Sequence, residues 1–243
     1  MNEQIEGIVL KQTEYRENDV LLSVLCQDIG RISLVGKGVL KNTSKNAAIC
    51  VPYSQSLFQF DYSSLKTMFP LHTGSIIHSN WRIRENLKAI AAASVMAELI
   101  EKTTQQGEPV NHLYQELSFC LKQMHEGASV FCVLVYFIAR MLEELGIDPN
   151  VDECVLCEND EISAISINEG GFVCRRCATQ VQTVNVPLTS LKIFRYVNKA
   201  HQKDFVALEK ACDVQQNDVQ IFVDFICLHS GMKLESVQFF MDC

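Results

Sequence analysis

The 243-residue chain lacks the long apolar run that a membrane helix requires. Its longest apolar stretch is Val130–Ala139, whereas a bilayer-spanning helix needs about twenty residues. The first residues, MNEQIEGIVL, contain neither a basic start nor an apolar run, so no signal peptide is expected. Repeats and low-complexity linkers are also missing. These absences predict a soluble, cytoplasmic protein without a membrane partner.

A secretory disulfide framework is not expected either, although the chain contains eleven cysteines. Without a secretion signal, the thiols should stay reduced. Seven cysteines show no paired spacing and are expected to pack as small apolar side chains or to lie at a frayed terminus. They are Cys26, Cys50, Cys120, Cys132, Cys212, Cys227 and Cys243.

Basic residues are fewer than acidic ones, and the formal net charge is −8. Taken alone, this surplus of carboxylates argues against a nucleic-acid partner. Two stretches nevertheless contain four basic residues each and no acidic residue. The first has Arg31, Lys37, Lys41 and Lys45, and the second has Lys192, Arg195, Lys199 and Lys203. A polyanion would have to bind at these local stretches.

The first 80 residues read as short strands. Alternating patterns in EGIVLKQTEY, DVLLSVLCQD, GRISLVGKGVL and QSLFQFDYSS, with LHTGSIIHSN as a last strand, suggest five of them. Five short strands in about 80 residues fit a small barrel. An OB-fold is a common barrel of this size, and by pattern alone an SH3-like barrel is nearly as good.

After Ser79 the hydrophobic period changes to that of helices. We expect a first helix capped by Asn80, then two helices ended by Gly127 and Gly146, then shorter ones near 188–200, 203–212 and 216–230. The predicted fold class is therefore α+β with two domains. Residues 1–80 form an OB-fold barrel and residues 81–243 a helical domain, into which a module at 151–186 is inserted.

Four further cysteines define that module. Cys154 and Cys157 form one C-x-x-C pair and Cys174 and Cys177 another, with sixteen residues between the pairs. This spacing is a zinc pattern, and four thiolates close a tetrahedral site to water and substrate. The alternatives are a thioredoxin-like pair, which lacks a βαβ context, a deaminase-type zinc, which lacks its His-x-Glu, and an iron–sulfur cluster with different spacings. We predict one structural Zn²⁺ per chain and no enzymatic activity.

The two basic stretches have competing interpretations. Gly36 and Gly38 beside Lys37 would let a phosphate chain approach the backbone, although no P-loop sequence occurs. Tyr15, Phe58, Phe60 and Tyr62 could stack bases, but core packing is favoured for each. In the second stretch, Lys192, Arg195, Lys199 and Lys203 would line one helix face, extended by Arg175 and Arg176. Each stretch could equally be a solvated surface.

The N-terminal segment GIVLKQTEYRENDVLLSVLCQDIGRISLVGKGV resembles the signature of the bacterial recombination mediator RecO family. The matching residues are Tyr15, Glu17, Asp19, Gly30, Arg31, Lys37 and Gly38. The family's architecture is an OB fold followed by a helical domain, often with a four-cysteine zinc module. The resemblance therefore covers essentially the whole chain.

The resemblance implies a DNA repair and recombination mediator of the RecF pathway. Such a protein binds single- and double-stranded DNA, anneals complementary strands, recognises the acidic tail of single-stranded DNA-binding protein (SSB) and acts with RecR to load RecA, in the cytoplasm on the nucleoid. DNA binding then falls to Arg31, Lys37, Lys41 and Lys45, and the SSB tail or further DNA to the second stretch. The alternative is a zinc-containing interaction scaffold that binds no nucleic acid.

Overall fold

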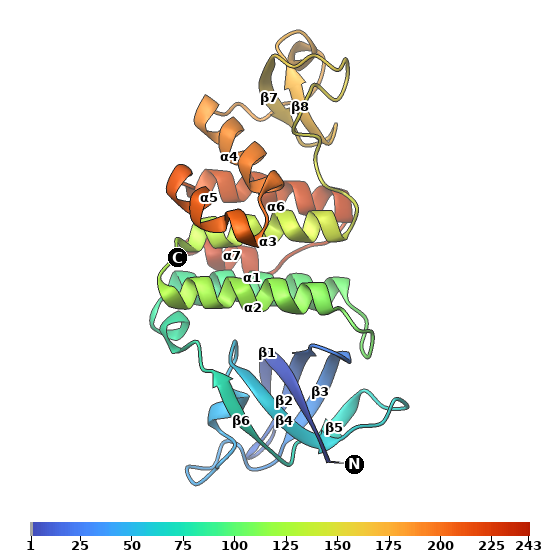
Figure 1. The fold of residues 1–243 in the computed structure, drawn as a ribbon, viewed down its shortest axis with the longest axis vertical. Helices are drawn as coiled ribbons and strands as arrows, with labels where there is room; N and C mark the ends of the chain where they lie inside the picture. Colours follow the sequence, from blue (N-terminus) through green and yellow to red (C-terminus); the bar gives the residue numbers. More distant parts are fainter. Residues whose placement is uncertain (1) are drawn as a thin grey trace. The chain divides into compact units, whose positions relative to one another are not determined.

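The computed structural model describes residues 2–243, with side chains from Gln4 onward (Figure 1). The chain divides into two compact units, one ending at Glu126 and the other beginning at Gly127. Among the described residues, no helix is long and apolar enough to cross a membrane.

The first unit begins with a curled six-stranded sheet in the order β5-β3-β2-β1-β4-β6. Its strands are β1 Asn2–Arg16, β2 Asp19–Cys26, β3 Gly30–Gly36, β4 Gln55–Asp61, β5 Met68–Pro70 and β6 Thr73–His78. All pairs are antiparallel except β3 with β5. The sheet curls because β1 is long enough to pair with β4 through its first half and with β2 through its second, with a register shift after Val9.

Apolar side chains on the inner face of this sheet form its core. Strand β3 alternates buried and half-buried residues, as expected for a sheet with one covered face. Phe58, Phe60 and Phe69 are fully buried there, and the rings of Phe60 and Phe69 lie 5.1 Å apart. The short parallel strand β5 was not expected from the sequence, so the sheet has six strands instead of five.

Two helices complete the first unit, α1 Leu87–Thr103 and α2 Asn111–Glu126. The predicted start of the first helix at Asn80 is wrong. Asn80 adopts a left-handed conformation and its side-chain amide donates to the Tyr53 carbonyl at 2.9 Å, ahead of a 3₁₀ turn at Trp81–Glu85. The helix is capped instead by Asn86, whose Oδ1 accepts from the Ala89 backbone N–H at 3.2 Å.

A buried polar network joins α2 to the sheet. The Tyr114 hydroxyl donates to Glu6 Oε1 at 2.7 Å, and the Gln55 side-chain amide donates to the same oxygen at 2.6 Å. Burial and the neighbouring Glu6 carboxylate raise the pKa of Tyr114, so its hydroxyl stays a donor. This network ties α2 to the strands, and the first compact unit accordingly extends to Glu126. The domain boundary predicted from the sequence lies at residue 80.

The second unit contains five helices and one hairpin. They are α3 Val130–Glu144, β7 Ile162–Ser166, β8 Gly171–Cys174, α4 Leu188–Lys199, α5 Phe205–Ala211, α6 Gln216–Ser230 and α7 Ser236–Asp242. Helix α3 is buried from Cys132 to Leu142, as its uniformly apolar sequence predicts for a central helix, and it packs on α6. Helix α7, which anchors Phe240 in the interior, was not expected.

The predicted fold class is confirmed: a curled N-terminal β-sheet is followed by helices, and a four-cysteine cluster lies within the helical part. The cluster belongs to the β7–β8 hairpin and its flanking turns, which Figure 1 shows beyond the helices of the second unit.

Candidate metal centre and nucleic-acid interface

The four paired cysteines converge on one point. All four Sγ atoms lie within 4.8 Å of one another, with Cys157 at 3.7 Å from Cys174 and 3.5 Å from Cys177. Four sulfurs at about 2.3 Å from a tetrahedral zinc would be separated by about 3.8 Å. The donor set and its spacing therefore fit a closed four-thiolate site, as the sequence predicts.

Two tight turns and one hairpin bring the cysteines together. In the first turn, the backbone N–H groups of Cys157 and Glu158 donate to the Cys154 carbonyl at 3.3 and 2.8 Å. The hairpin β7–β8 then returns the chain through Gly170, whose φ of +83° favours glycine, to the second pair. Local backbone geometry thus orients the sulfurs without a large apolar core.

The surroundings act differently on the individual sulfurs: the pKa of Cys154 and that of Cys174 are lowered, whereas the interaction with Cys157 raises the pKa of Cys177 to about 12. Burial raises the pKa of Cys154, but backbone N–H groups of Cys174, Leu156 and Cys157 outweigh it and lower the pKa to about 6. Arg176, between the last two cysteines, interacts with the sulfurs of Cys157 and Cys177, which raises the pKa of its guanidinium. Arg176 thus lies against the cysteine cluster, where it offsets negative charge.

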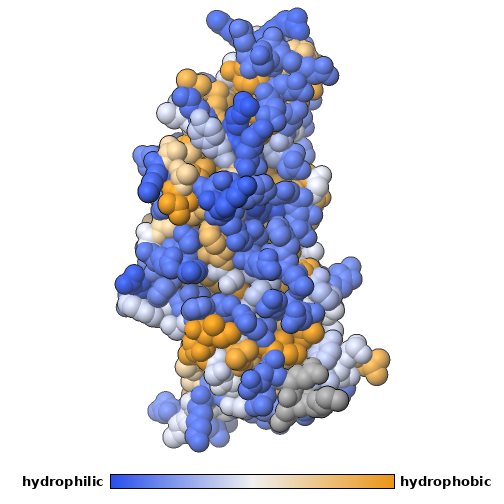
Figure 2. Space-filling model, in the orientation of Figure 1, coloured by the Kyte–Doolittle hydropathy of each residue, from blue (hydrophilic) through white to orange (hydrophobic). Residues whose placement is uncertain are grey.

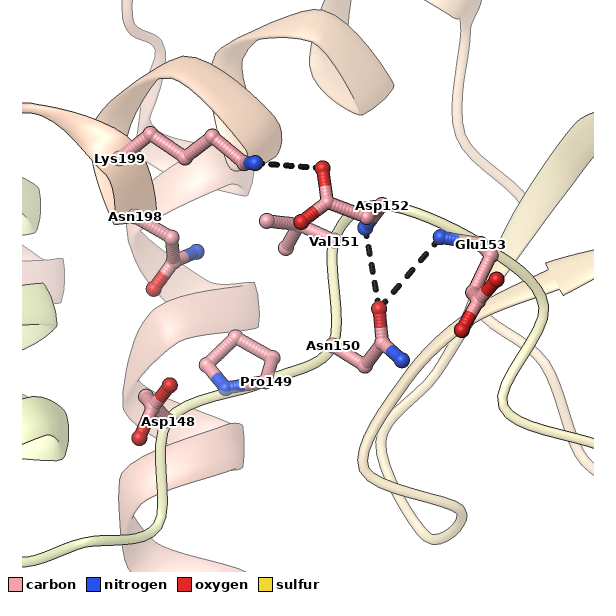
Figure 3. A pocket seen from close by; sticks show the side chains of 8 residues that line it. All are labelled: Asp148, Pro149, Asn150, Val151, Asp152, Glu153, Asn198 and Lys199. Carbon is pink, nitrogen blue, oxygen red and sulfur yellow. Dashed lines mark hydrogen bonds and ion pairs between the residues drawn. The ribbon is translucent and has the colours of Figure 1, made fainter. Parts of the chain in front are cut away.

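The second basic stretch is only partly available for an external ligand. Arg195 and Lys199 on α4 both bind the carboxylate of Asp152, Arg195 at 3.0 Å. Figure 3 shows the contact of Lys199 with Asp152. Figure 3 shows Asp152 in the loop that leads into the cysteine module, with Asn150 Oδ1 accepting from the backbone N–H groups of Asp152 and Glu153. These cations therefore fasten the module to α4.

The other predicted residues of that stretch are spread over different elements. Lys192 is exposed on α4, and Arg175 is exposed beside the cysteine cluster. Lys203 lies beyond the end of α4, because Ala200 is extended and the chain enters a separate 3₁₀ turn at Gln202–Asp204. The stripe on α4 therefore ends at Lys199.

The first basic stretch forms an exposed loop after β3. Lys37, Lys41 and Lys45 are exposed in turns, and none of them forms an ion pair within the part of the chain that the structure describes. Asp19 Oδ1 accepts from the Gly38 backbone N–H at 2.8 Å, where Gly38 has a φ of +64°. The Asp and Lys-Gly of the recognised signature thus hold one another, and three cations project from the loop.

Arg31 is separated from these lysines by its own contacts. Its Nη2 donates to the Thr104 carbonyl at 2.9 Å and its Nε to the Thr104 hydroxyl at 3.3 Å. Its carbonyl accepts from the Gly107 N–H at 2.9 Å, and Gly30 approaches the Glu108 backbone so closely that a Cβ would lie 1.8 Å from its carbonyl oxygen. Together these contacts form a clasp between the β2–β3 turn and the chain after α1.

The predicted aromatic candidates divide into core and surface. Phe58 and Phe60 are fully buried, and Tyr62 packs against Phe69 with ring centroids 5.7 Å apart. Tyr15 is exposed, and the Arg16 guanidinium lies 5.2 Å from its ring centroid. Only Tyr15 of this set lies open to a ligand.

Sequence reasoning also missed a longer charge asymmetry. Residues 29–84 contain seven basic residues and a single acidic one, Asp61. That carboxylate is partnered by His72 at 3.1 Å. The seven are Arg31, Lys37, Lys41, Lys45, Lys66, Arg82 and Arg84. A charge count over residues 1–80 as a whole hides this asymmetry, because all acidic residues of that segment except Asp61 precede Ile29.

Two family models match the chain. Recombination protein O N terminal matches residues 1–80, and Recombination protein O C terminal matches residues 84–218. Proteins named DNA repair protein RecO are similar over most of their length. The one from Bacillus subtilis is 30% identical over 96% of this chain and 92% of its own. The one from Bacillus pumilus is 29% identical over 96% and 91%.

Proposed function

We propose, from the premise that the chain belongs to the RecO family of DNA repair and recombination proteins, that it is a recombination mediator. In this role it binds single- and double-stranded DNA, anneals complementary strands, engages the SSB tail and acts with RecR to load RecA. The observation that carries the DNA-binding part is the loop of Lys37, Lys41 and Lys45, whose charges no carboxylate pairs with among the described residues.

The charge distribution supports this proposal against the acidic average. A net charge of −8 repels a polyanion at long range, but salt screens charges beyond about 8–10 Å. At shorter range, phosphates would meet three unpaired lysines within a segment that contains one acidic residue in 56. Binding is therefore expected to be local and strongly dependent on salt concentration.

The cysteine cluster is proposed to hold a structural Zn²⁺. Four sulfur donors leave no coordination position for substrate, and the metal would supply the interior that the small module lacks. We also propose that two exposed cations, Lys192 on α4 and Arg175 beside the cysteine cluster, contribute to an acidic-tail or DNA surface.

DNA binding is tested by fluorescence anisotropy of a labelled single-stranded oligonucleotide over a salt series. We expect the logarithm of affinity to fall with the logarithm of salt at a slope of roughly −2 to −4, at about −0.7 per neutralised phosphate. The Lys37→Glu/Lys41→Glu variant should bind all sequences more weakly and with a shallower slope.

A matched control carries the same charge change elsewhere: Lys210→Glu/Lys233→Glu, in the second unit. Equal losses in both double variants would mean that net charge, not the loop, governs binding. No binding by the unmodified protein at low salt would favour the scaffold alternative instead. A second titration uses an acidic peptide with an apolar C-terminus in place of DNA. The Lys192→Glu/Arg175→Glu variant should weaken peptide binding more than DNA binding, which would distinguish a peptide-binding surface from the DNA-binding surface.

A further inference from the structure

The only tryptophan of the chain lies at the surface. Trp81 begins the 3₁₀ turn between β6 and α1, and its side chain is 45% exposed. Ile83 in the same turn is fully buried. Tryptophan is highly buried on average, so an exposed indole on an anchored turn calls for a reason. The short turn holds the ring at the surface and limits its freedom.

Two arginines, Arg82 and Arg84, follow Trp81 in the same turn. The Arg82 guanidinium lies 5.5 Å from the centroid of Trp81, and its Nη1 donates to the His125 carbonyl at 3.4 Å. The His125 ring meets the indole edge-to-face at 5.9 Å. Arg84 Nη1 donates to the Ser79 carbonyl at 2.7 Å. These contacts fix the aromatic ring and both cations in one small region of the first unit.

The charges of both arginines remain available to an anion. Their hydrogen bonds go to main-chain carbonyl oxygens, and neither forms an ion pair with any of the carboxylates described from Gln4 onward. Residues 62–84 contain no Asp or Glu at all. Glu85 follows in sequence, and Glu126, the last residue of α2, is paired with Lys122 at 3.8 Å.

A strand connects this region with the lysine loop. The Asn46 side chain, next to Lys45, donates to the His72 carbonyl just before β6 at 3.1 Å, and Trp81 follows the end of that strand. Six residues of strand span about 20 Å. Strand β6 is an edge strand and contains no Asp, Glu, Lys or Arg. A flexible polyanion can therefore follow it from one set of cations to the other.

We propose that Trp81 is a stacking platform for a base of single-stranded nucleic acid, and that Arg82 and Arg84 neutralise the adjoining phosphates. An aromatic ring beside guanidinium groups is the combination that binds unpaired bases without sequence preference, whereas bases within a duplex expose no face for it. This inference rests on the proposed DNA binding. It assigns the contact to a site that is separate from the lysine loop.

The test uses intrinsic fluorescence, because Trp81 is the only tryptophan. The full-length protein is titrated with an oligothymidine of about 20 nucleotides, longer than the roughly 4–16 nucleotides that one OB fold covers. We expect saturable quenching of Trp81 emission with the same midpoint as the anisotropy of labelled oligothymidine. The Trp81→Ala variant should bind about 5- to 150-fold more weakly, as loss of one stacked base implies.

Two controls keep the result interpretable. Tyr196→Ala removes an aromatic side chain that is 49% exposed on α4 and should leave affinity unchanged. Trp81→Phe keeps a stacking ring and should retain most of the affinity. Circular dichroism melting of Trp81→Ala checks the fold, while the emission measurement needs no variant at all.

The outcomes separate this inference from the proposed function. Normal anisotropy with unchanged Trp81 emission and full affinity of Trp81→Ala would overturn the stacking site but leave DNA binding intact. Quenching by an acidic peptide and not by oligothymidine would also overturn it, since the region would then be a peptide site. Absence of any anisotropy change at low salt would overturn both proposals.

Discussion

The curled N-terminal sheet, called the N-terminal barrel, and the cysteine module both contain short strands, but the two pack these strands by different means. The barrel interior contains fifteen buried side chains, among them Phe58, Phe60 and Phe69. In the module, five buried residues cluster around the sulfurs, and three of these are Cys154, Cys174 and Cys177. Ile165 and Phe172 of the hairpin are buried as well, and the ring of Phe172 packs against Phe194 of α4. Figure 2 shows hydrophilic side chains over most of the visible surface of the module, whereas apolar ones gather over the strands of the first unit. We therefore expect hydrophobic burial to stabilise the first of these β structures, and the proposed metal site to supply most of the stability of the second.

Removal of the metal should give the largest difference in stability between the module and the barrel. Chelation of the proposed Zn²⁺, or Cys154→Ser/Cys157→Ser, should unfold the module and leave the barrel folded. The apparent binding free energy of structural zinc in peptides is about 10–16 kcal/mol, which is as large as the folding free energy of a whole domain. Hydrogen exchange should show lost protection in residues 151–186 only, and metal analysis of the untreated protein should give about one zinc per chain.

Cys243→Ser is the control, because this exposed cysteine lies outside the cluster. A chelated protein with unchanged exchange in the module would contradict the comparison, since thiols alone would then support its fold.

A cavity in the barrel should have the opposite effect: it should destabilise the first unit and leave the module folded. Phe58 on β4 is fully buried and lies opposite Ile5 of β1, so Phe58→Ala removes a large side chain from packed surroundings. We expect a loss of about 3–5 kcal/mol in the unfolding free energy of the first unit, with zinc content unchanged. This loss is measured by urea denaturation, in which hydrogen exchange of the amides in β1–β4 reports the unfolding of the first unit. A loss of less than about 1 kcal/mol would mean that the barrel core does not stabilise this unit as argued.

The hairpin of the module also depends on one close approach. A Cβ on Gly171 would lie 2.2 Å from the Asn150 carbonyl oxygen, which accepts from the Phe172 N–H at 2.9 Å. Gly171→Ala should therefore displace Asn150 and destabilise the module by about 1–3 kcal/mol. Zinc release by a competing chelator should become faster. Gly146→Ala is the matched control, because Gly146 also has a positive φ but nothing lies within 4 Å of the added Cβ.

The smallest effect is expected at the ion pairs between the module and α4. Lys199 and Arg195 hold the pKa of Asp152 below its ordinary value of 3.8, so their stabilisation is present above about pH 4 and disappears as pH falls through the lowered pKa. Asp152→Asn should cost less than about 1 kcal/mol near neutral pH, because exposed pairs are screened. Its melting temperature should converge with that of the unmodified protein on acidification. Persistence of the difference at pH 2 would show that packing and not charge is responsible.

The sequence predicts best where the physical cause is local. The spacing of Cys154, Cys157, Cys174 and Cys177 led to the cluster because two tight turns and a glycine hairpin need no distant partner. The uniformly apolar pattern around Val130–Ala139 led to a central helix, because such a helix is stable only when surrounded.

Prediction failed where a distant contact decides. Asn80 resembles a helix cap, but its amide is used by Tyr53, and the helical pattern that begins at Trp81 includes a 3₁₀ turn before the true cap. Arg31 looks like its neighbouring lysines in sequence, yet Thr104, 73 residues away, accepts its hydrogen bonds. Local patterns contain no information about either partner.

The clasp of Gly30 and Arg31 on Thr104, Gly107 and Glu108 limits where the chain can be truncated or joined to a relative in a chimaera. The two family models meet between residues 80 and 84, which invites a fragment that ends there. Such a fragment would release a guanidinium that the intact chain keeps occupied, and would add a cation to its surface. Its affinity for polyanions would then overstate that of the parent. A chimaera between relatives should therefore exchange the strands together with the α1–α2 connection.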